Sequence, residues 1–119
     1  MCSIVKEKSL KFAVRIVKMY QFLINDKKEH ILSKQLVRAG TSIGANIHEA
    51  YQGSSKKDFI NKLTISLKES NETEYWLILL KETGYLSETQ FDSIYLENVE
   101  IIKLLTSIIK TSKKNLLEN

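Results

Sequence analysis

The sequence contains no proline, four glycines and one cysteine in 119 residues. About five prolines per hundred residues are usual in soluble proteins, and sheets, sandwiches and proline-rich linkers need more turn residues than this chain has. The single cysteine, Cys2, excludes an intrachain disulfide framework and a cysteine-rich zinc site. No segment approaches the roughly 20 apolar residues that cross a membrane. These absences favour a protein built from long helices.

The overall amino-acid composition is that of an ordinary globular protein. Hydrophobic residues make up 43% of the chain and charged residues 27%, which argues against disorder. A chain of 119 residues has room for one hydrophobic core, so we expect a single domain over residues 1–119. The N-terminal residues lack the apolar region of a secretory signal, and we expect a soluble, cytoplasmic protein with its one thiol reduced.

Four segments have the spacing of apolar residues that is typical of amphipathic helices. They span residues 3–25, 32–52, 56–83 and 88–117. Ser55 and Ser87 precede acidic or amide residues at the distance found in N-terminal caps, and Gly53 and Gly84 are expected to end the helices before them. Short connections make consecutive helices antiparallel. The predicted fold is all-α, an antiparallel up-down-up-down four-helix bundle.

The apolar faces of the four segments differ in character. In the first segment the expected core stripe is formed by residues three and four apart: Ala13, Ile16, Val17, Tyr20, Leu23 and Ile24. The second segment contains Gly40 and Gly44, each of which costs about 1 kcal/mol relative to alanine inside a helix, so we expect a neighbouring helix to pass close by. The third segment is apolar on two sides, which predicts two neighbours or one neighbour and another subunit.

Positive charge is concentrated at the start of the chain. Residues 1–38 contain nine Lys or Arg and three acidic residues, although the whole chain has a net charge of only +4. Lys8, Lys11, Arg15 and Lys18 are three and four residues apart, so they share one helix face, and we expect that face to stay in solvent. This face is the candidate nucleic-acid-binding surface. The alternative is a solvated face that keeps the protein soluble.

A search for catalytic or metal-binding patterns finds none. His30 and His48 each adjoin a glutamate, but the chain has no Glu-x-x-His pair of the kind that holds a di-iron centre in a bundle. It also has no phosphate-binding glycine loop and no nucleophile elbow. We therefore predict no catalytic residues, no metal, no cofactor, no small-molecule substrate and no enzyme activity.

Acidic residues cluster in the third segment at Glu69, Glu72 and Glu74. We interpret the cluster as structural, because no partner base accompanies it. Glu72 can pair with Lys68 four residues away. Arg38, on the preceding antiparallel segment, is predicted to form an ion pair with Glu69 or Glu72. Asn46 borders the apolar stripe of the second segment and either fixes helix packing or contacts a ligand.

One stretch resembles a known family. Residues 38–50, Arg-Ala-Gly-Thr-Ser-Ile-Gly-Ala-Asn-Ile-His-Glu-Ala, are similar to the pattern of the bacterial 23S rRNA intervening-sequence protein family, in which a basic residue leads into Ser-Ile-(Gly or Pro)-Ala-Asn-Ile and a Glu. The resemblance continues through residues 55–59, 67–77 and 82–86. Its structural signature comprises Arg38, Ser42, Gly44, Asn46, Glu49, Glu69 and Glu72.

The resemblance implies an antiparallel four-helix bundle that commonly assembles as a homopentamer. A related branch serves as the accessory protein of diversity-generating retroelements and binds a reverse transcriptase and nucleic acid. We therefore expect a non-enzymatic homo-oligomer that binds RNA or a ribonucleoprotein through a basic surface. The alternative is a protein-interaction adaptor, such as a reverse-transcriptase accessory protein. No membrane association is expected.

Overall fold

The computed structural model describes residues 3–53 and 55–118, so Cys2 and the thiol considered above lie outside the described residues. It contains helices α1 (Ile4–Asn25), α2 (Leu32–Tyr51), α3 (Lys56–Glu82) and α4 (Glu88–Glu118). All regular secondary structure in the described residues is helical, which confirms the predicted fold class. Each boundary lies within one residue of its predicted position.

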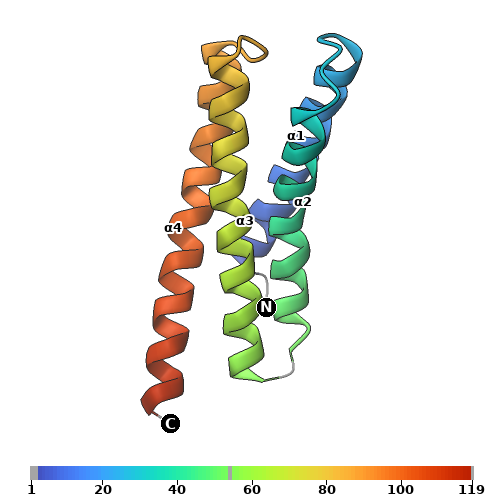
Figure 1. Ribbon diagram of the computed structural model, residues 1–119. Helices are drawn as coiled ribbons and strands as arrows, with labels where there is room; N and C mark the ends of the chain where they lie inside the picture. Colours follow the sequence, from blue (N-terminus) through green and yellow to red (C-terminus); the bar gives the residue numbers. More distant parts are fainter. Residues whose placement is uncertain (1–2, 54, 119) are drawn as a thin grey trace.

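The helices run up and down in a bundle of 52 × 23 × 21 Å (Figure 1). Each helix packs against its neighbours in sequence, and α1 also contacts α4, which closes the bundle. The α1–α4 contact is the loosest of these interfaces. Consecutive helices are antiparallel because their connections are short, as predicted.

Local sequence fixes the helix ends. The Ser55 hydroxyl accepts a hydrogen bond from the Asp58 backbone N–H at 3.0 Å. At the start of α4, the Ser87 hydroxyl accepts from the Gln90 N–H at 3.1 Å, while the Gln90 side chain accepts from the Ser87 N–H at 2.9 Å. Gly53 and Gly84 adopt positive φ values of 64° and 85° just after α2 and α3, a conformation that glycine adopts at little cost.

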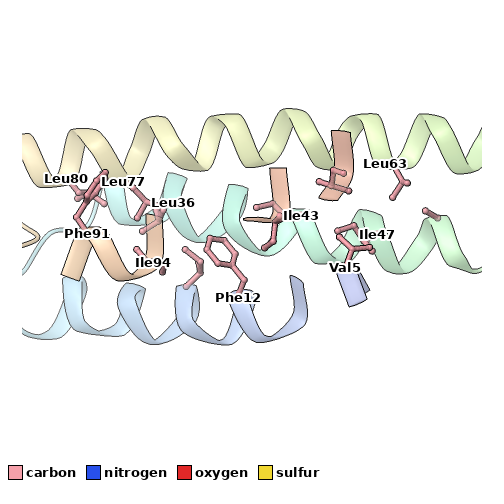
Figure 2. Packing of buried hydrophobic residues seen from close by; sticks show 14 of the residues in the cluster. Val5, Phe12, Leu36, Ile43, Ile47, Leu63, Leu77, Leu80, Phe91 and Ile94 are labelled. Atoms are coloured by element: carbon pink, nitrogen blue, oxygen red, sulfur yellow. The ribbon is translucent and has the colours of Figure 1, made fainter. Parts of the chain in front are cut away.

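The core is a continuous set of aliphatic and aromatic side chains along the bundle axis (Figure 2). Phe12, Ile43, Leu63 and Ile94 are fully buried and represent one helix each. In α2 the buried apolar residues are Leu36, Ala39, Ile43, Ile47 and Ala50, and Leu32 packs on the core. Their three- and four-residue spacing in the sequence predicts this face correctly.

In α1 the predicted core stripe was misplaced. The buried residues are Val5, Ser9, Phe12, Ile16 and Leu23. Of the predicted set, Ile16 and Leu23 are buried, whereas Val17 is 38% exposed and Ala13, Tyr20 and Ile24 are half-buried. The physical reason is that α1 carries two parallel apolar stripes with the same spacing, and only one of them can face a core on one side of the helix.

Two buried polar contacts join α3 to its neighbours. The Ser66 hydroxyl donates to the Ile43 carbonyl of α2 at 2.8 Å. The Asn98 side-chain amide, fully buried in α4, donates to the Ser70 carbonyl of α3 at 3.0 Å. Each bond requires one particular alignment of two helices, so these polar groups help to fix how the helices are registered.

Candidate functional surfaces

The small-residue part of α2 lies against α1. A Cβ atom added to Gly40 would stand 2.8 Å from the Ile16 side chain, and one added to Gly44 would stand 3.3 Å from the Ser9 carbonyl oxygen. The predicted close helix neighbour is therefore α1 of the same chain. At Gly40 and Gly44 the side chain and backbone of α1 occupy the space that a large side chain would need.

Arg38 of α2 joins the predicted acidic residues of α3. Its guanidinium forms ion pairs with Glu72 and with Glu69, the latter at 3.3 Å. The Trp76 indole N–H donates to the same Glu72 oxygen at 3.0 Å. This indole hydrogen bond, followed by the bond and the charge of Arg38, outweighs partial burial and holds the pKa of the Glu72 carboxyl below its ordinary value.

The predicted ion pair of Arg38 is confirmed, and the exposure of its side chain indicates how much the pair contributes to stability. The Arg38 side chain is 49% exposed, so the pair is a surface interaction. We expect Arg38→Ala to lower the free energy of unfolding by less than about 1 kcal/mol, because solvent screens exposed pairs and Glu72 keeps its bond from Trp76. Urea denaturation of the wild-type and variant proteins, at equal protomer concentration, measures this difference.

A loss of about 3 kcal/mol or more is typical of a buried pair that has lost one partner. Such a result would contradict the exposure seen in the single chain. It would mean that another subunit covers the Arg38 cluster.

The other polar residues of the family-like signature make contacts within the chain. Ser42 donates to the Arg38 carbonyl at 2.7 Å, and Asn46 donates to the Ser42 carbonyl at 2.8 Å, so both bond to their own helix. Glu49 pairs with Lys62 of α3 at 3.1 Å. Glu74 contacts α4, where its carboxylate hydrogen-bonds the Tyr95 phenol. This bond, together with the charge of Glu74, raises the pKa of the phenol.

A buried glutamate caps α2, and sequence reasoning missed it. Glu29 is 7% exposed. Its carboxylate accepts hydrogen bonds from the backbone N–H groups of Ile31, Leu32 and Ser33 at 3.2, 3.0 and 2.7 Å. Burial alone would raise the pKa of this carboxyl, but the three backbone bonds outweigh burial and lower it. The only sequence signal was an acidic residue four positions before the buried Ser33.

The predicted basic face of α1 is divided between α4 and solvent. Lys8 pairs with Glu100 at 3.0 Å, and Arg15 pairs with Glu97 and donates to the Ser93 hydroxyl at 3.0 Å. Lys11 and Lys18 are exposed. The expectation that all four side chains would extend freely into solvent is therefore wrong for Lys8 and Arg15, whose side chains are each 40% exposed. The Lys8 and Arg15 side chains contact α4 across the α1–α4 interface, which is the loosest in the bundle.

A second apolar stripe faces outward along α1. Leu10, Val14 and Val17 are 55%, 48% and 38% exposed, and they recur at the spacing of one helix face. A shallow groove of about 380 Å³ is lined by Ala13, Val14, Val17, Lys18 and Gln21. Single exposed apolar residues are normal, whereas large contiguous apolar surfaces are typical of interaction sites.

The described residues contain neither a metal-binding cluster nor a helix suited to cross a membrane. Within residues 3–53 and 55–118, no three His, Cys, Asp or Glu side chains lie close enough together to hold a metal ion. Over the same ranges, none of the helices combines the length and the apolarity that a membrane crossing requires.

Comparison with known proteins agrees with this architecture. The family model described as 23S rRNA-intervening sequence protein matches residues 2–107. No curated protein matches the chain. A crystal structure of a protein of unknown function from the S23 ribosomal protein family of Bacteroides thetaiotaomicron superposes with a TM-score of 0.89. It is 62% identical, over 90% of this chain and 96% of the other. The chain belongs to the 23S rRNA-intervening sequence protein family.

Proposed function

We propose that the protein is a non-enzymatic cytoplasmic assembly protein that forms a homo-oligomer, most simply a pentamer, and presents basic side chains to RNA or a ribonucleoprotein. The observation that carries the proposal is the outward apolar stripe of α1, Leu10, Val14 and Val17. Burying it against another copy would remove apolar surface from water, at about 25 cal/mol per Å². The pentameric state is what the family resemblance implies.

Assembly is tested by introducing charge into the stripe. We expect wild-type protein to have a mass of about 68 kDa in solution, five times the 13.7 kDa of one chain. We expect Val14→Lys with Val17→Lys to dissociate it while helicity is retained, because two desolvated ammonium groups would oppose the contact. Light scattering and sedimentation measure the mass, and circular dichroism measures helicity.

The matched control is Leu117→Lys, which adds a charge at a residue that is 87% exposed at the far end of α4. It should leave the mass unchanged. A wild-type mass near 14 kDa at micromolar concentration, or an unchanged mass in the double Lys variant, would remove this stripe from the interface.

RNA binding is tested on the candidate basic face. We expect wild-type protein to bind structured RNA weakly and with little sequence preference, since lysine contacts to phosphate do not read bases. Affinity should fall steeply as salt rises. Lys11→Glu with Lys18→Glu should abolish most binding, because these two cations are exposed. Fluorescence anisotropy at low salt gives the dissociation constants.

The control for that test is Lys34→Glu with Lys103→Glu, which makes the same charge change at exposed residues of α2 and α4. Equal weakening by both pairs would indicate a general charge effect rather than a site on α1. If wild-type protein does not bind at all, the adaptor function becomes the better account.

A further inference from the structure

At one end of the bundle the described residues form three helices, α2, α3 and α4. Helix α1 has 22 residues and α4 has 31, which correspond to lengths of about 33 and 46 Å. Figure 1 shows that the first turn of α1 lies partway along the bundle, whereas α2, α3 and α4 continue past that point. Figure 2 shows Val5, in the first turn of α1, next to Ile47 of α2. Beyond this level α1 does not cover the other three helices.

A groove occupies this three-helix end, and we call it the open-end groove. It has a volume of about 340 Å³. Its lining comes from the end of α2, the α2–α3 connection, the start of α3 and the last turns of α4: Ala50, Gly53, Ser55, Lys56, Phe59, Ser112 and Asn115. Phe59, which is half-buried, supplies apolar surface above the buried Ala50. Its ring makes an edge-on contact with Tyr51, with the two ring centroids 5.1 Å apart.

The segments that line the open-end groove are positively charged. Residues 51–61 and 110–118, which hold all of the lining except Ala50, contain five lysines and two acidic residues, a net charge of +3. The lysines are all exposed: Lys56, Lys57, Lys110, Lys113 and Lys114. The N-terminus of α3, the positive end of its dipole, lies at the same place. By contrast, α4 neutralises Lys8 and Arg15 on α1.

We propose that the open-end groove binds an acidic amphipathic helix of a partner protein, which extends the line of α1 along the three-helix end. Apolar side chains of that helix would pack on the exposed part of Phe59, and its carboxylates would meet the lysines of these two segments. Helices commonly bind in this way to grooves that match one apolar face. The site goes beyond assembly and RNA binding, and it does not depend on the α1 stripe.

The chemistry of the groove favours a peptide over RNA. Every cation in the two segments is a lysine, whereas arginine makes the bidentate phosphate contacts. Phe59 is half-buried and makes an edge-on contact with Tyr51, so only part of its ring is open to a stacking base. An apolar surface beside lysines suits a helix that has leucine on one side and glutamate on the others.

The proposal is tested by selecting binding peptides from a library in which the peptide charge is not fixed in advance. A displayed library of peptides of about 15 residues keeps leucine on one helical face and offers Glu, Gln or Lys elsewhere. Full-length protein is the bait. We expect enrichment of Glu over Lys, and micromolar binding of the enriched peptides by fluorescence anisotropy. Lys56→Glu with Asn115→Glu should weaken that binding about tenfold, since the reversed charge repels carboxylates.

The control variant is Asn71→Glu with Lys103→Glu, which repeats the same substitutions at exposed residues of α3 and α4 away from the groove. Its affinity should equal that of wild-type protein. Four results would each overturn the proposal: no enriched peptide, enrichment of Lys, equal binding by the groove variant, or displacement of the peptide by a single-stranded RNA at micromolar concentration. The last result would make the groove a site for polyanions.

Discussion

Gly44→Leu should lower the free energy of unfolding by about 3 kcal/mol, the upper part of the range for overpacked sites. The Cβ atom alone would lie 3.3 Å from the Ser9 carbonyl oxygen. That oxygen belongs to the backbone of α1, so it cannot rotate away as the end of a side chain could. The remaining carbons of leucine would force α1 and α2 apart along their crossing, and urea denaturation at fixed protomer concentration measures the loss.

Two further variants separate overpacking from the general effects of a larger residue. Gly44→Ala should be close to neutral, because a gain of about 1 kcal/mol in helix propensity offsets a tight contact. Gln35→Leu places the same side chain at an exposed residue of α2 and should leave the stability unchanged. If Gly44→Leu unfolds at the same urea concentration as wild-type protein, the two helices are farther apart than the structure has them.

The parts of the fold that sequence predicted well depend on local chemistry. The capping residues at Ser55 and Ser87 and the glycines after α2 and α3 act within a few residues, so helix boundaries follow from the sequence alone. The Arg38 ion pairs were also predictable, because a short connection makes α2 and α3 antiparallel neighbours. The exposure of the Arg38 side chain was not predictable, since it depends on how far the guanidinium extends beyond the packed surface.

The parts that sequence missed depend on contacts between distant segments. The two apolar stripes of α1 have equal spacing, and only packing against α2 and α4 shows which of them is buried. The neutralisation of Lys8 and Arg15 by Glu100 and Glu97 joins residues more than 80 positions apart. Asn98 is a further example, because its polar side chain conceals a core position in α4. Periodicity finds apolar residues, and it passes over polar residues that packing buries.

The second large change in stability is expected at Glu29, the capping residue that sequence analysis missed. Glu29→Ala should lower the free energy of unfolding by about 2 kcal/mol. The substitution leaves the Ser33 N–H without its acceptor in a fully buried position, and it removes a negative charge from the N-terminus of α2. Glu82→Ala, at an exposed residue near the end of α3, is the control and should cost nothing.

The Glu29 carboxyl also predicts how stability changes with pH. Its pKa is lower in the folded protein than the ordinary value of 4.5, so the folded state binds this proton less readily than the unfolded chain does. The stabilisation is therefore complete above the unfolded pKa and is lost as pH falls through the folded one. Glu29→Gln, which cannot ionise, should lack this component. Urea unfolding between pH 7 and pH 3 should show the wild-type advantage over Glu29→Gln shrinking below about pH 4.5. An advantage that stays constant over that range would show that the cap acts through shape and hydrogen bonding alone, with no contribution from the charge of the carboxylate.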